Sequence, residues 1–157
     1  MTAFIVEADG ASRGNPGPAG YGAVVKDAAG RVLAEVAEAI GTATNNVAEY
    51  RGLIAGLRAV LDLAGEGAEV QVRMDSKLVV EQMSGRWQIR NEGLRPYARE
   101  AAALARRLRV TWRWVPRAEN AHADRLANEA MDAAAQGRPW RSGAAAPAPP
   151  APGRSPE

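Results

Sequence analysis

The sequence predicts one α/β domain built on a five-stranded mixed sheet, in which three antiparallel strands precede two parallel crossover strands and helices flank the sheet. Three observations predict it. The 157 residues, 46% of them hydrophobic and 24% charged, suit one globular core. The predicted elements follow the order β-β-β-α-β-α-α-β-α, which favours a meander joined to two crossovers. No cysteine is present, which excludes disulfides and zinc–thiolate sites.

The first three strands are apolar segments separated by glycine and proline. Residues 3–9 predict the first strand, and residues 12–20 form a turn region. Residues 21–27 and 31–40 predict a hairpin that turns around residues 28–30. The antiparallel half of the sheet therefore occupies the first quarter of the chain.

Helices and strands alternate in the rest of the domain. A helix is predicted over residues 47–63, a strand over 68–74, a short helix over 76–85, a helix over 96–108 and a strand over 110–115. A Thr or Asn caps the first of these helices, and Asn120 is predicted to cap a last helix that runs to about Gln136. The two later strands would join the sheet in parallel.

The last fifteen residues differ in composition from the rest. They contain half of the ten prolines, so they cannot build a core. We therefore expect one folded domain over residues 1–140 and a disordered Pro/Ala-rich linker over residues 141–157, which leads to a further domain. The N-terminal sequence resembles a strand and not a signal peptide, and no apolar run is long enough to span a bilayer. We expect a cytoplasmic monomer without membrane contact.

Charge is distributed unevenly along the chain. Residues 1–85 carry 7 basic and 11 acidic side chains, whereas residues 86–117 carry nine arginines and only two glutamates. Arginine offers a planar fork of donors that suits phosphate. A solvated helix face explains the same composition equally well.

Four carboxylates stand where predicted strands end or helices begin: Asp9, Glu49, Asp75 and Asp124. Each has an ordinary structural explanation: a turn for Asp9, the helix dipole for Glu49 and Asp124, and a helix cap for Asp75. Elements that end at one edge of a sheet can instead gather such residues into one pocket. Carboxylate oxygens are preferred ligands of Mg²⁺, and paired ions cleave phosphodiesters. The pattern therefore favours a two-metal nuclease, although spacing alone does not establish that the acids converge.

The segments DGASRGNPGPAGYGAVV, TNNVAEYRGLIAGL, MDSKLVVEQMSGRW and VPRAENAHADRLANEA resemble type 1 ribonuclease H over about residues 3–135, so that residues 1–140 would form a ribonuclease H domain. The chain is similar in particular to the ribonuclease H domain of actinobacterial bifunctional proteins, where a Pro/Ala-rich linker precedes an acid-phosphatase-like domain. The resemblance implies hydrolysis of the RNA strand of RNA–DNA hybrids, leaving 5′-phosphate and 3′-hydroxyl ends. Double-stranded RNA stays open as a second substrate.

The resemblance also implies roles for the four acids. Asp9 would bridge two Mg²⁺ ions, for which Mn²⁺ can substitute. Asp124 would hold the ion that activates water, and Glu49 and Asp75 would hold the ion at the leaving oxygen. All four are thus expected to be both metal ligands and catalytic residues.

Nucleic-acid contacts are implied at seven further positions. Asn15, Thr44, Asn45 and Asn46 match residues that meet the hybrid, and such amides can recognise a 2′-hydroxyl. Arg86 and Arg90 are expected to replace in part a lysine-rich protrusion that this chain lacks, and Arg117 stands in the loop where many members carry a catalytic histidine.

Two other residues are expected to take no part in catalysis. His122 lies two positions before Asp124, which turns it about 200° around a helix, so we expect a solvated or capping side chain. Trp87 is expected in the core, with a place beneath the bound DNA strand as the alternative.

Two alternatives remain. Integrases, transposases and resolvases share this fold class and use similar acids, but the TNN-x-x-E loop and the Gly-Asn-Pro-Gly turn favour ribonuclease H. A module that binds hybrids or double-stranded RNA without cutting them is the second alternative. Four carboxylates held together without metal would repel one another, which argues against it.

Overall fold

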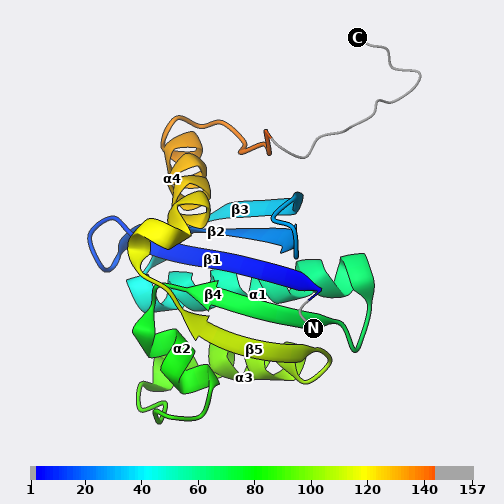
Figure 1. Cartoon of the computed structure of the whole chain (residues 1–157). Helices are drawn as coiled ribbons and strands as arrows, with labels where there is room; N and C mark the ends of the chain where they lie inside the picture. The colour runs from blue at the N-terminus through cyan, green and yellow to red at the C-terminus, as the bar shows by residue number, and fades with distance from the viewer. Residues whose placement is uncertain (1–2, 144–157) are drawn as a thin grey trace, which may run out of the picture.

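The computed structural model describes residues 3–143, and the predicted linker beyond residue 143 lies outside the described residues. A five-stranded sheet with the strand order β3-β2-β1-β4-β5 forms its centre (Figure 1). The strands are β1 (Phe4–Ser12), β2 (Gly17–Asp27), β3 (Val32–Ala43), β4 (Glu69–Met74) and β5 (Arg109–Trp114). Strands β1, β2 and β3 pair antiparallel, and β4 pairs in parallel with both β1 and β5. The predicted mixed sheet is confirmed.

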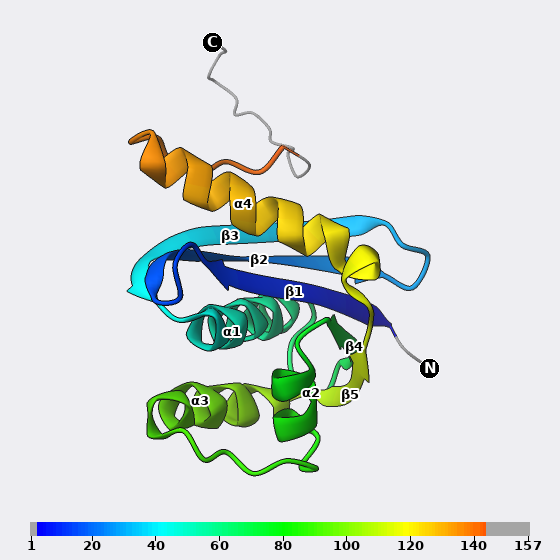
Figure 2. The same ribbon diagram turned by 90° about the vertical axis from the view of Figure 1, so that its left-hand side faces the viewer.

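Four α-helices flank the sheet: α1 (Asn45–Ala64), α2 (Lys77–Met83), α3 (Arg95–Ala105) and α4 (Ala121–Ala135), with short 3₁₀ turns η1 (Glu92–Leu94) and η2 (Arg117–Asn120). Figure 2 shows α4 on one face of the sheet and α1 to α3 on the other. Helix α4 packs against β1, β2 and β3, and Figure 1 shows β4 and β5 beyond its edge. The part of that sheet face formed by β4 and β5 is therefore left uncovered by α4.

The main core lies between α1 and the sheet. Leu53 and Leu57 of α1 are fully buried together with Val6 of β1 and Val72 of β4. Burial of such aliphatic side chains stabilises the fold by about 1.5–3 kcal/mol each. Helix α1 is thereby held with its first turns at the edge where β1 and β4 end.

Several predicted boundaries move by a few residues. Strand β2 begins at Gly17, within the predicted turn region, because its first residues pair with the end of β3. Thr44 caps α1, since its hydroxyl accepts a hydrogen bond from the Val47 N–H at 3.2 Å. Helix α3 ends at Ala105, three residues before the predicted end.

Between residues 3 and 143, the helices are all too short or too polar to cross a lipid bilayer.

Candidate active site

Three of the four predicted acids converge at the edge where β1 and β4 end. Asp9, Glu49 and Asp75 each offer a carboxylate oxygen, and these oxygens lie within 4.8 Å of one another. Asp9 is only 6% exposed, and Glu49 and Asp75 are half-buried. These three side chains, which come from a strand, a helix and a loop, form what we call the acid cluster.

Close packing of α1 on β1 brings Glu49 to Asp9. A side chain at Gly10 would place its Cβ 2.2 Å from the backbone carbon of Ala48, so only glycine allows this approach. The Gly10 N–H donates a hydrogen bond to Oε1 of Glu49 at 3.0 Å. The Asp-Gly pair at residues 9–10 therefore does not form a turn. It lies within β1 and admits the helix.

Asp75 follows β4, and its carboxylate does not cap α2. Ser76 is the cap, because its hydroxyl accepts from the Val79 N–H at 3.2 Å. The Asp75 carboxylate instead accepts a hydrogen bond from the side-chain amide of Asn120 at 2.8 Å. The helix-cap explanation of Asp75 is therefore wrong, and its oxygens face the acid cluster.

Asn120 is the residue whose function the sequence did not predict. It stands at the N-cap position of α4, as predicted, but its side chain makes no capping hydrogen bond. Its Nδ2 donates to Asp75 Oδ1 and to the Ala8 carbonyl, both at 2.8 Å, and the residue is 1% exposed. Asn120 therefore occupies the predicted cap position, but its side chain is turned to the sheet, where its NH2 group meets two buried acceptors. The buried carbonyl Oδ1 has no partner within the described residues.

Asp124 joins the cluster through Asp9, from the first turn of α4. This helix approaches β2 closely, since a Cβ at Gly22, the residue paired with Asp9, would lie 2.5 Å from the Ala123 carbonyl. The Asp124 carboxyl lies close enough to Asp9 to raise the pKa of Asp9. Its side chain is one-third exposed and lies 4.0 Å from the guanidinium of Arg117. The structure thus brings all four predicted acids to one edge.

Burial and mutual repulsion raise the pKa values of carboxyls in the acid cluster. The pKa of Asp9 rises to about 8, first because the carboxyl is buried, then because of the Asp75 charge and the hydrogen bond with Asp124. Burial, followed by the charges of Asp9 and Asp75, raises the pKa of Glu49 well above its ordinary value. Carboxyls that resist ionisation this way lack a counter-charge, and a bound cation would supply one.

The donor set suits a hard divalent cation. All the side-chain ligands are carboxylate oxygens, which Mg²⁺ and Mn²⁺ prefer, and neither cysteine nor histidine stands among them. The acid cluster can therefore bind a divalent metal ion.

The predicted nucleic-acid residues near β1 form a hydrogen-bonded loop pair beside the cluster. Asn45 accepts from the Ser12 N–H at 2.7 Å, and its own N–H donates to Oδ1 of Asn15 at 3.0 Å. Asn15, Thr44 and Asn46 are exposed. The loops before β2 and α1 are thus fixed to one another, with amides left at the surface.

The predicted basic residues after α2 differ in their surroundings. Arg86 pairs with Glu81, whereas Arg90 is exposed and has no ion pair within residues 3–143. Trp87 is 46% exposed, so the predicted core position is wrong. The segment after α2 runs along the surface, and its backbone bonds back to the helix through the Trp87 N–H and the Glu81 carbonyl.

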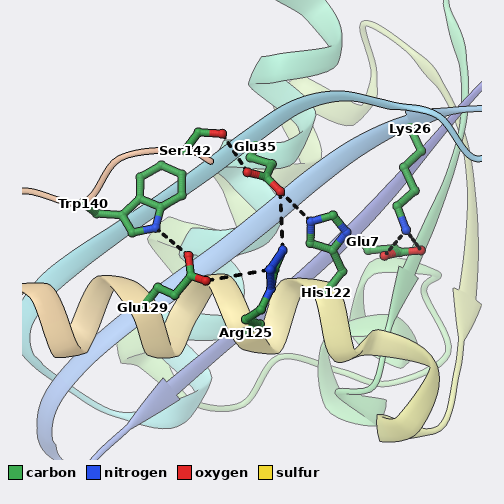
Figure 3. Close-up of polar contacts among 8 residues, drawn as sticks. All are labelled: Glu7, Lys26, Glu35, His122, Arg125, Glu129, Trp140 and Ser142. Carbon is green, nitrogen blue, oxygen red and sulfur yellow. Dashed lines mark hydrogen bonds and ion pairs between the residues drawn. The ribbon is translucent and has the colours of Figure 1, made fainter. Parts of the chain in front are cut away.

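His122 faces away from the cluster, as the helix register predicted. Figure 3 shows it pointing from α4 to Glu35 of β3, with Nε2 2.6 Å from Oε2. Arg125 lies 3.7 Å from the same carboxylate, whose side chain is 2% exposed, and Ser142 donates to it at 2.7 Å. The expectation of a solvated or capping histidine is wrong, because His122 pairs with a buried acid.

Comparison with known families agrees with the fold and the acid edge. A family model described as reverse transcriptase-like matches residues 7–130. Ribonuclease H of Erythrobacter litoralis is 36% identical over 143 residues, covering 79% of this chain and 92% of that protein. The chain belongs to the ribonuclease H family.

Within this family the chain is similar to the bifunctional protein Rv2228c of Mycobacterium tuberculosis H37Rv, at 62% identity over 134 residues, 84% of this chain. The match covers only 36% of that longer protein. The solved N-terminal RNase H domain of Rv2228c, a fusion with maltose-binding protein, aligns with a TM-score of 0.82 and 60% identity over 87% of this chain and 99% of that one. LC11-RNase H1, solved in complex with an RNA/DNA hybrid, aligns with a TM-score of 0.81 and 40% identity, over 84% of this chain and 99% of that chain.

Proposed function

We propose that this chain is an endoribonuclease that hydrolyses the RNA strand of RNA–DNA hybrids and leaves 5′-phosphate and 3′-hydroxyl ends. The convergence of Asp9, Glu49 and Asp75 within 4.8 Å, in a chain of the ribonuclease H family, carries the proposal. A similar protein solved with an RNA/DNA hybrid supports the choice of substrate. Hydrolysis of double-stranded RNA is the related activity to be measured beside it.

Asp9, Glu49, Asp75 and Asp124 would hold two Mg²⁺ ions, with Mn²⁺ as a substitute. When bound, such ions activate water and stabilise the charge that develops on the phosphate. Because the pKa values of Asp9 and Glu49 are raised, both carboxyls must lose a proton before they act as ligands. Metal binding should therefore release protons near neutral pH.

The surrounding residues fix these ligands before the substrate arrives. The Asn120 amide holds Asp75, and the Gly10 N–H holds Glu49. Hydrogen bonds of this kind to ligating groups typically contribute 10–100-fold to metal affinity or activity. His122 takes no part, since it is bound to Glu35.

The exposed amides of Asn15 and Asn46, next to Thr44 and Asn45, would meet the sugar edge of the hybrid and recognise the 2′-hydroxyl. Arg90 and Arg117 are exposed and would contact phosphates. Arg117 also lies 4.0 Å from Asp124, and Arg86 shares its guanidinium with Glu81.

We also propose that residues 1–140 form the catalytic domain of a cytoplasmic, monomeric enzyme and that residues 141–157 form a linker to a phosphatase-like domain. The similarity to one third of a bifunctional protein and the lack of cysteine support this arrangement. Ser142, the second residue of this proposed linker, still donates a hydrogen bond to Glu35, so the linker would begin in contact with the domain.

A cleavage assay tests the proposal. The purified chain is incubated with end-labelled RNA–DNA hybrid, double-stranded RNA, single-stranded RNA and double-stranded DNA, with Mg²⁺, Mn²⁺ or a chelator. We expect metal-dependent cleavage of the RNA strand of the hybrid and none in the chelator. Binding of the hybrid without cleavage in either metal would favour the binding module instead.

A further inference from the structure

The sheet face that α4 leaves uncovered, on β4 and β5, carries a group of arginines. Strand registers show which side chains share this face: Asp9 pairs with Gly22, which α4 contacts, and Glu7 lies on the same face two residues earlier. In the strand register Glu7 of β1 lies opposite Arg73 of β4, and Arg73 lies opposite Arg113 of β5. We call Arg73, Arg109 and Arg113, with Gln71 and Thr111 between them, the arginine face.

Two of the three arginines on this face are not balanced by a carboxylate among the described residues. Arg109 lies 3.8 Å from Glu69, and Glu7 is occupied by Lys26 at 3.1 Å (Figure 3). Arg73 donates to the neutral Oε1 of Gln71 at 2.6 Å. Within residues 3–143, neither Arg73 nor Arg113 forms an ion pair with an acid. Two guanidinium groups are therefore available to an external anion.

The arginine face adjoins the acid cluster. Arg73 stands two residues before Asp75 on β4, a distance of roughly 7 Å along the strand. Arg113 stands beside Arg73 on β5, which is the edge strand of the sheet. One nucleic-acid strand carries a charge about every 3.4 Å of helix axis, so a separation of roughly 7 Å corresponds to about two nucleotides.

We propose that the arginine face binds the phosphate backbone of the hybrid beside the cleavage site, through Arg73 and Arg113. This inference rests on the proposed function. Arginine presents a planar fork that matches phosphate oxygens, and the fork of Arg113 is exposed. Positive charge on the surface next to the acid cluster also offsets the electrostatic repulsion between the carboxylates and the phosphates of the nucleic acid. An acidic protein partner would need the same charges but not their position next to Asp75.

The test compares Arg113→Gln and the double variant Arg73→Gln/Arg113→Gln with Arg106→Gln. Arg106 is a matched control, because it is exposed at the end of α3, away from the acid edge, and has no ion pair in the described part of the chain. An Arg113→Lys variant keeps the charge and removes the fork. KM and kcat are measured on a long hybrid, and binding affinity is measured against salt in an Asp75→Asn background.

We expect Arg113→Gln to raise KM and weaken binding about fivefold, and the double variant to do so further, with kcat within about twofold of the parent. The slope of log affinity against log salt should fall by about 0.9 for each phosphate that the variant no longer binds. Arg113→Lys should recover part of the affinity, and Arg106→Gln should match the parent.

Unchanged KM and an unchanged salt slope in the double variant would overturn the inference and leave an acidic partner as the explanation of the face. Equal losses in Arg106→Gln would overturn it as well, since net charge and not local binding would then set affinity. Arg113→Gln alone carries the test should the double variant unfold. If the parent chain does not cleave the hybrid at all, the proposed function is refuted. If the parent is active and the variants keep its KM and salt slope, only this inference is refuted.

Discussion

Replacing Asn120 with alanine tests whether this buried amide positions the acid cluster. The side chain is 1% exposed and donates to the Asp75 carboxylate and the Ala8 carbonyl, both at 2.8 Å. Asn120→Ala removes both hydrogen bonds and leaves the two acceptors without their donor.

The expected loss of stability can be worked out from these hydrogen bonds. A buried acceptor left unsatisfied costs about 1–3 kcal/mol, and a hydrogen bond to a charged group contributes about 1.5–3 kcal/mol. Because the half-buried Asp75 can be rehydrated, we expect the free energy of unfolding to fall by about 2–4 kcal/mol in total. The cleavage rate should fall about 10–100-fold, since Asp75 loses its orientation.

Urea unfolding gives the stability change, and kcat on the hybrid with saturating Mg²⁺ gives the change in activity. Asn128→Ala serves as the control. Asn128 is half-buried; it donates to the Asp124 carbonyl at 3.0 Å, accepts from Arg13 at 3.0 Å and lies 3.4 Å from the Asp124 carboxylate. Because these groups stay within reach of water, Asn128→Ala should cost about 1 kcal/mol or less. An Asn120→Ala variant with the parent's stability and kcat would refute the assignment of this amide to the site.

The remaining predictions concern pH, His122 and the chain end. The folded, metal-free protein keeps a proton on Asp9 (pKa about 8) that the unfolded chain loses near pH 4, so its unfolding free energy should fall as pH rises between these values. At about 1.4 kcal/mol per pKa unit, and with the repulsion shared among the acids, we expect a fall of roughly 2–4 kcal/mol, which Asp9→Asn should reduce; a flat urea-stability profile would contradict it. His122→Ala should keep kcat within about threefold of the parent, because its ring bonds to Glu35 and not to the cluster; a loss of over a hundredfold would place it in the site. A chain that ends at residue 143 should have the melting temperature of the full chain, measured by circular dichroism. A chain that ends at residue 137 lacks the hydrogen bonds of Trp140 and Ser142, so its melting temperature should be about 2–5 °C lower.

The sequence predicted the sheet and the four acids because both leave local signals. Alternating apolar segments mark strands, and the motifs around Asp9, Glu49, Asp75 and Asp124 are each contiguous. Their convergence required the parallel placement of β4 beside β1, which the order of elements favoured.

The side-chain environments that the sequence did not predict depend on contacts between distant segments. Asn120 stands at the predicted helix end, but its side chain bonds to Asp75, 45 residues earlier, and no local pattern predicts that pairing. His122 meets Glu35 across 87 residues, and only the register of α4 on β3 brings them together. Trp87 is exposed because the segment after α2 lies on the surface, although its hydrophobic side chain favoured the core.

Cleavage by Asp75→Asn tests the central claim most directly. The substitution keeps the shape of the side chain and its contact with Asn120, but replaces a charged oxygen ligand by an amide. Measured with labelled RNA–DNA hybrid in Mg²⁺, the parent should cut the RNA strand and Asp75→Asn should not, although the variant should fold and still bind the hybrid. Cleavage by the variant at a rate near the parent's would contradict the account of the acid cluster as the catalytic centre.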